Sequence, residues 1–196
     1  IVSASAFVRD IDNLMRREVT LRQTPNGPRW VSSPANIGSA RTSGIELEAK
    51  FPLEELMKGA PNIDLRANYS RFWSSVEGIP GPDNRLDQQA DQTANVGVDY
   101  RMKGLPLTLG GGFNWTPATY VQTSLTERVT SGPKRQLDMY GLWKFNNDVQ
   151  LRIAGSNLLG DDYDPERLVT TNGPSKISFG EARSYRTLSV KLELKL

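Results

Sequence analysis

The side chains that most often carry enzyme chemistry are missing from this chain of 196 residues, which contains no cysteine and no histidine. Without an imidazole or a thiol, the sequence has no Ser-His-Asp or Cys-His nucleophile, no His or Cys ligand for zinc and no disulfide. A metal site would have to use carboxylates, carbonyl oxygens and water. These absences favour binding or transport over catalysis, so we expect neither an enzyme nor a cofactor.

Basic and aromatic residues in the polar segments are the remaining candidates for a binding site. Cationic side chains at these places would attract an anionic ligand, although ordinary solvated loop charges explain them as well. The candidates are Arg29, Trp30, Arg85, Arg128, Lys134, Arg135, Arg167 and Lys176. The overall balance of 24 basic against 22 acidic residues is too even to indicate a nucleic-acid partner.

One acidic segment, Asp161-Asp162-Tyr163-Asp164-Pro165-Glu166, could hold calcium through its carboxylates. It lacks the roughly 12-residue spacing, with a central Gly and a final Glu, that a calcium loop uses. A turn started by Asp and Pro explains the segment better. We therefore expect no metal site.

The elements that position these residues are β-strands, because apolar residues recur at every second position. The clearest alternation is at the C-terminal end, where Leu188, Val190, Leu192, Leu194 and Leu196 are separated by polar residues. Seven further strands are predicted at 2–9, 45–51, 63–70, 95–100, 105–115, 137–145 and 149–153. A single helical turn is predicted at 53–58, between Pro52 and Gly59.

The connections between these strands alternate in length. Long links rich in Pro, Gly and Ser occupy 24–38, 77–84, 117–133 and 160–180, whereas the links at 102–104 and 146–148 are tight. No apolar run approaches the roughly 18 to 20 residues of a membrane-spanning helix. Long loops at one end and short turns at the other are typical of an outer-membrane barrel, and aromatic residues near both strand ends are typical of its interfaces. A soluble β-sandwich also alternates apolar and polar residues, so the period alone leaves the solvent open.

Several short motifs resemble the C-terminal barrel of TonB-dependent outer-membrane receptors. They are AFVRDIDNL at 6–14, RTSGIELE at 41–48, LDMY at 137–140, NLLGDDY at 157–163 and RSYR at 183–186, before the alternating last strand. Each motif is short, but their order and spacing agree over nearly the whole chain. The family usually ends in an aromatic residue, whereas this sequence ends in Leu196.

The resemblance implies an all-β fold, an antiparallel transmembrane β-barrel of about 22 strands with an N-terminal plug. Residues 1–196 would be a single segment supplying about the last eight strands, and the plug would lie outside it. The implied function is uptake of a ferric siderophore or a similar scarce nutrient across the outer membrane of a Gram-negative bacterium. The implied partners are that ligand, TonB through the plug, outer-membrane lipid and lipopolysaccharide.

Three other functions remain open at this point. A complete eight-stranded barrel acting as an adhesin or structural protein would differ from a receptor by having no plug upstream. A soluble β-sandwich binding module would be monomeric without detergent. A membrane-barrel hydrolase is disfavoured because the chain has no histidine. Among the long links, the one after Trp115 is expected to take part in ligand recognition.

Overall fold

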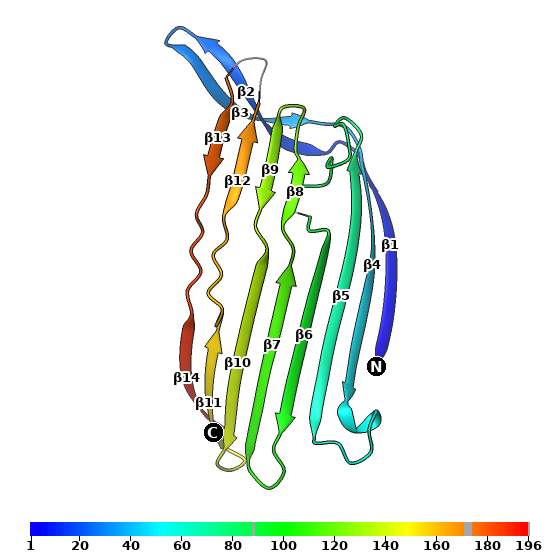
Figure 1. The fold of residues 1–196 in the computed structure, drawn as a ribbon, viewed down its shortest axis with the longest axis vertical. Coiled ribbons are helices and arrows are strands. Elements are labelled where there is room, and N and C mark those ends of the chain that lie inside the picture. The colour runs from blue at the N-terminus through cyan, green and yellow to red at the C-terminus, as the bar shows by residue number, and fades with distance from the viewer. Residues whose placement is uncertain (88, 171–173, 196) are drawn as a thin grey trace.

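The computed structural model describes residues 1–87, 89–170 and 174–195. Its largest element, which we call the wall, is an antiparallel sheet made of β1 (Val2–Ile11), β4 (Ala40–Pro52), β5 (Ile63–Val76), β6 (Gln92–Arg101), β7 (Leu107–Thr116), β10 (Lys134–Lys144), β11 (Val149–Ser156) and β14 (Thr187–Leu194). The strands follow this order across the sheet (Figure 1). All eight predicted strands are therefore confirmed, although Leu196 lies outside the described residues. In the described part β1 and β14 are the two edges, so the wall is not a closed eight-stranded barrel.

The pairing register gives the wall one apolar and one polar face. One row across it consists of Ala49, Ala67, Val96, Phe113 and Leu137, each opposite the next on the neighbouring strand. Successive side chains along a strand point to opposite faces. The residues directly before and after each member of this row therefore point to the other face, which is polar. In the described part of the chain, the large apolar side chains of the first face are exposed. A soluble β-sandwich would cover such a face with a second sheet.

The ends of the wall differ as the sequence predicts. Figure 1 shows tight turns at one end, where the Met102 amide donates to the Leu107 carbonyl and the Phe145 amide to the Val149 carbonyl. The predicted helical turn is the 3-10 helix Leu53–Glu55 at the same end. Within the ranges given above, no helix is long and apolar enough to cross a membrane.

At the other end, three of the predicted long links contain further strands, so their prediction as loops was wrong. We call the hairpin β2 (Met15–Thr24) and β3 (Gly27–Asn36) the arm. We call the sheet formed by β8 (Thr119–Gln122), β9 (Glu127–Ser131), β12 (Pro165–Val169) and β13 (Lys176–Phe179) the extension. Its order, β13-β12-β9-β8, repeats the order β14-β11-β10-β7 of the wall below it (Figure 1).

The extension and the wall are separated by a break in all four strands at about the same level. Two breaks occur at prolines, because Pro117 follows β7 and Pro133 precedes β10, and proline has no N–H to donate to a ladder. The other two are the longer stretches 157–164 and 180–186. Each strand therefore continues upward after an interval in which regular pairing stops, apart from one bridge between Tyr163 and Ala182.

A small apolar core lies where the wall meets the β5–β6 connection, residues 77–91. Its buried members are Ala40, Val76 and Ile79, and Leu86 packs against them from the connection. Val76 lies an even number of positions from Asn68 and Ser70 on β5. Residues at such a spacing point to the same face of a strand, so Val76 is on the polar face. The β5–β6 connection is therefore folded onto the polar face of the wall.

Candidate functional site

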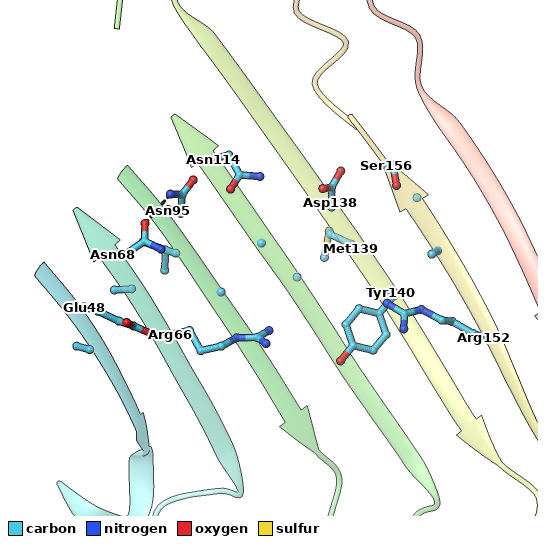
Figure 2. A pocket seen from close by; sticks show the side chains of 18 residues that line it. Glu48, Arg66, Asn68, Asn95, Asn114, Asp138, Met139, Tyr140, Arg152 and Ser156 are labelled. Atoms are coloured by element: carbon cyan, nitrogen blue, oxygen red, sulfur yellow. Dashed lines mark hydrogen bonds between the residues drawn. The ribbon is translucent and has the colours of Figure 1, made fainter. Parts of the chain in front are cut away.

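The polar face carries a row of amide side chains. Asn68, Asn95, Asn114 and Gln136 lie opposite one another on β5, β6, β7 and β10, and Glu48 continues the row on β4. The Asn95 amide donates a hydrogen bond to Oδ1 of Asn68. Figure 2 shows the three asparagines side by side on adjacent strands. This row presents both hydrogen-bond donors and acceptors to whatever occupies that side.

Most of the amide row lines a shallow cavity of about 480 Å³, which we call the lower cavity (Figure 2). Charged and aromatic side chains cross its wall in a chain of contacts. Nη2 of Arg66 lies 3.0 Å from Oδ2 of Asp99, and Oη of Tyr140 donates to Oδ1 of Asp99 at 2.6 Å. The Arg152 guanidinium lies 4.1 Å from the centre of the Tyr140 ring, at cation–π distance. These side chains come from four strands, and they combine two guanidinium groups with one carboxylate.

Glycine makes this arrangement possible. Gly110 lies on β7 between Asp99 and Tyr140, and a Cβ atom built there would overlap both side chains. Gly97 and Gly112 are opposite each other on β6 and β7 and line the lower cavity. The absence of side chains at these positions lets the tyrosine and arginines lie flat along the sheet.

A second cavity, of about 620 Å³, lies where the wall meets the extension, and we call it the upper cavity. The β5–β6 connection forms one side of it through Asp87 and Ala90. The other sides include Thr119, Val121, Val129, Ser131, Lys134, Tyr163 and Arg167. This cavity combines two basic groups, one carboxylate and several hydroxyls with the apolar side chains of Val121 and Val129.

Contacts between its own side chains organise the upper cavity. Nζ of Lys134 lies 3.9 Å from the centre of the Tyr163 ring, and the Tyr163 and Ser131 hydroxyls are 2.8 Å apart. Nη1 of Arg167 lies 2.7 Å from Oε1 of Glu127, which is only 1% exposed. Burial raises the pKa of the Glu127 carboxyl, Arg167 opposes this rise, and the nearby Asp87 adds to it. Glu127 therefore fixes the position of Arg167 without itself facing solvent.

The structure brings together only two of the eight predicted binding residues, Lys134 and Arg167. Arg85 instead donates to the Phe72 carbonyl at 3.0 Å and pairs with Asp91, which anchors the β5–β6 connection. Arg135 pairs with Asp161 at 2.7 Å beside Trp115, on the apolar face. The remaining four line neither cavity: Arg29 and Trp30 lie on the arm, Arg128 lies on the side of β9 opposite Val129, and Lys176 begins β13.

Sequence reasoning missed Glu127 and Arg16, the two buried charged residues near the upper cavity. The alternation in β9, where Glu127 shares a face with Val129, was the available signal for Glu127. The acidic segment after β11 is used structurally, since Asp161 pairs with Arg135 and Oδ1 of Asp162 accepts the Ser184 amide at 2.8 Å. Among the described residues, no three acidic side chains gather as they would around a metal ion.

Comparison with known proteins identifies the family. The family model described as TonB dependent receptor-like, beta-barrel, matches residues 1–158, from the start of β1 to just beyond the end of β11. This chain belongs to that family. The predicted resemblance is therefore confirmed over most of the sequence. No match was found among the curated proteins or among the solved structures compared with it.

Membership of the TonB-dependent receptor family assigns the two faces of the wall. The exposed apolar face is the lipid-facing side of a receptor barrel, and the polar face is the lumen side. The tight turns belong to the periplasmic end, and the arm and the extension belong to the extracellular end. Both cavities therefore open toward the lumen, and the upper cavity is nearer the outside. Members of the family are outer-membrane transporters rather than enzymes.

Proposed function

We propose that residues 1–196 form a single segment of the barrel of a receptor that takes up a small anionic nutrient, such as a ferric siderophore, with energy from TonB. The plug that contacts TonB would belong to another part of the receptor. The observation that carries the proposal is the placement of Lys134 and Arg167 in a lumen-facing cavity at the extracellular end. A ligand entering from outside would meet this cavity before the lower one.

The chemistry of the upper cavity suits a ligand rich in oxygen atoms. The ion pair with Glu127 is made by Nη1 of Arg167, and its other N–H donors have no protein partner among the described residues. Lys134 is held against Tyr163 and presents a second cation. Hydroxyls of Thr119, Ser131 and Tyr163 would add neutral hydrogen bonds, which give specificity without excess charge.

An uptake experiment tests this proposal. The full-length receptor would be expressed in a strain that lacks it and supplied with radiolabelled ferric citrate, ferric hydroxamate and ferric catecholate chelates, and with cobalamin. Lys134→Gln and Arg167→Gln should each raise the half-saturating concentration roughly tenfold for one anionic chelate, the loss expected for a hydrogen bond to a charged group. Arg128→Gln and Lys176→Gln are the matched controls and should leave it unchanged.

Two outcomes would contradict the proposal. Uptake confined to cobalamin would show that the ligand is not an anionic chelate. Equal losses in the control variants would show that general surface charge, rather than the upper cavity, attracts the ligand. Single substitutions test the two cations more specifically than the deletion of Thr119–Gly132 would. That deletion removes β8 and β9 and with them one side of the cavity.

A further inference from the structure

Glu127 is a charged side chain with almost no access to solvent. It is the first residue of β9, and only 1% of the residue is exposed. Both carboxylate oxygens are buried, and among the described residues neither accepts a hydrogen bond of regular geometry. Its charge is compensated instead by the ion pair with Arg167 on β12, the strand that pairs with β9. Because a buried charge is costly without a partner, the ionised form of Glu127 depends on Arg167.

Arg167 is shared between this buried carboxylate and the upper cavity. Nη1 of Arg167 lies 2.7 Å from Oε1 of Glu127, yet 44% of the Arg167 side chain is exposed. The same side chain lines the upper cavity. An anion that Arg167 binds in the cavity would therefore draw on the positive charge that compensates Glu127.

Further charges act on Glu127 from two other elements. Arg16, on β2, is 9% exposed, and its guanidinium donates to the carbonyl oxygens of Thr123 at 3.1 Å and Arg85 at 2.5 Å. The main chain thus holds this positive charge in place, close enough to Glu127 for the two charges to interact. Asp87, in the β5–β6 connection, lines the upper cavity and brings a second carboxylate toward Glu127.

The balance of these charges changes when Glu127 is protonated. The charged groups in and around the upper cavity are Arg16, Lys134, Arg167, Asp87 and Glu127. Three cations against two carboxylates leave one positive charge, and a proton on Glu127 raises this to two. Burial raises the pKa of the Glu127 carboxyl, Arg167 lowers it and Asp87 raises it further, so this carboxyl takes up a proton more readily than an exposed one.

We propose that the upper cavity binds its anion together with one proton, which Glu127 takes up from solution. The proposal rests on the proposed function, because the negative charge of the ligand is what makes a second negative charge beside Arg167 unfavourable. As the anion engages Arg167, the Glu127 carboxylate loses its compensation, and protonation removes the cost of keeping that charge buried. One O–H bond forms on Glu127, and no other bond is made or broken. Glu127 is a positioning residue here, because it acts through Arg167 and does not contact ligand.

Linkage fixes the direction of the pH dependence. If the anion favours protonated Glu127, protonated Glu127 favours the anion by the same factor. Affinity should therefore be highest in mild acid and should fall as the pH rises. The fall should lie between the pKa of Glu127 in the free receptor, which burial places above the ordinary 4.5, and its higher value with the anion bound.

Proton uptake measured by calorimetry tests this coupling. The full-length receptor would be titrated in detergent, from about pH 5 to about pH 7.5, with ferric citrate and with ferricyanide, a trivalent anion that does not itself titrate in this range. Each titration would be run in two buffers with different ionisation enthalpies, because the difference in heat gives the number of protons taken up per anion. The unmodified receptor should take up a fraction of one proton with either anion. Glu127→Gln should take up none with ferricyanide.

The same substitution should also change the affinity. Glutamine keeps the shape of the Glu127 side chain and removes its negative charge. Glu127→Gln should therefore bind both anions roughly tenfold more tightly than the unmodified receptor at neutral pH, which is an ordinary size for a coupling between two sites. The difference between the two receptors should shrink as the pH is lowered, because acid protonates Glu127 in the unmodified receptor.

Glu166 offers a matched control on the same strand. It directly precedes Arg167 on β12, so its side chain points to the opposite face, and it does not line the upper cavity. Glu166→Gln should keep the proton uptake and the affinity of the unmodified receptor. If it changed both as Glu127→Gln does, general charge near Arg167 would explain the effect and the proposal would be wrong.

The two anions separate this proposal from the proposed function. Binding of ferric citrate without proton uptake by the unmodified receptor would overturn the coupling and leave the proposed function standing, and this result needs no variant. Weaker binding by Glu127→Gln at neutral pH, with proton uptake unchanged, would show that Glu127 only supports Arg167. If none of the ferric chelates binds while ferricyanide binds with a proton that depends on Glu127, the proposed function fails and the coupling stands. Absence of proton uptake with ferricyanide would overturn the coupling in either case.

Discussion

The wall and the structure above it share strand order but are stabilised in different ways. Large apolar side chains of the wall face outward and are exposed, for example Val190 at 71%. Buried apolar side chains of the described chain lie instead at the top of the wall or above it, as Val76, Ile79, Val121 and Val169 do. The wall therefore relies on lipid to cover its apolar face, whereas the extracellular part relies on a small core and buried charges of its own.

The strongest test of this difference places one charge on either face of the same strand. Ile153 and Ala154 are neighbours on β11, and they face lipid and lumen respectively. Ile153→Arg should cost about 2–4 kcal/mol of unfolding free energy, because a cation near the middle of the lipid-facing band is poorly solvated. Ala154→Arg should cost much less. Unfolding of the full-length receptor in lipid vesicles by urea would measure both, and equal costs would mean that the faces are assigned wrongly.

A smaller loss should follow from opening a cavity in the extracellular core. Val76→Ala removes fully buried methyl groups and should destabilise the β5–β6 connection by about 2 kcal/mol. Faster tryptic cleavage after Arg85 in outer-membrane vesicles would report this. Val98→Ala on the lipid face is the control, because lipid fills the space that the methyl groups leave. If both substitutions speed cleavage equally, the wall and the extracellular part are not stabilised in different ways.

Acidity should affect the extension through Glu127. Burial raises the pKa of this carboxyl, so the folded extension binds its proton more tightly than the unfolded chain does. Stability is therefore highest below the ordinary value of 4.5 and falls as the pH rises from there to the raised value. Amide exchange of β9, corrected for intrinsic rates, should show greater protection in mild acid than at neutral pH. Glu127→Gln should remove this dependence, and its persistence would assign the effect to another group.

The smallest effect is expected for an exposed ion pair at the top of the wall. Nε of Arg41 lies 2.6 Å from Oδ1 of Asp10, and both side chains are largely solvent-accessible. Arg41→Gln should leave the unfolding free energy unchanged within error, because solvent screens such pairs and their side chains lose entropy on pairing. Urea unfolding in the same vesicles would measure it. A loss as large as that of Val76→Ala would show that charge, rather than apolar burial, holds this end together.

The sequence predicts the wall well because the membrane imposes one rule on every strand. A lipid face requires an apolar residue at each second position, and the row from Ala49 to Leu137 follows that rule. The strands of the extension are only 4 to 5 residues long and mix Thr, Gln, Arg and Ser, so they carry too little periodicity to be recognised. Prolines near these short strands also favour the prediction of loops in the same segments.

The candidate site was predictable only in part, for a related reason. Lys134 and Arg167 could be proposed because cations in polar segments suit anionic ligands. Arg16 could not, because its burial arises from carbonyls that are 107 and 69 residues away in sequence. Glu127 is a single carboxylate in a polar stretch, and its partner Arg167 is brought near it by the pairing of β9 with β12. Local patterns carry no information about such distant contacts.

The breaks between wall and extension also set where this molecule bends. A sheet resists bending through its cross-strand hydrogen bonds, and the ladder between β7 and β10 resumes between β8 and β9 only after Pro117, Ala118, Gly132 and Pro133. The corresponding interval between β11 and β14 contains the single bridge of Tyr163 with Ala182. The sheet therefore resists bending less at this interval than in the wall or in the extension. We expect thermal bending of the sheet to be largest along this line, between the wall and the extension.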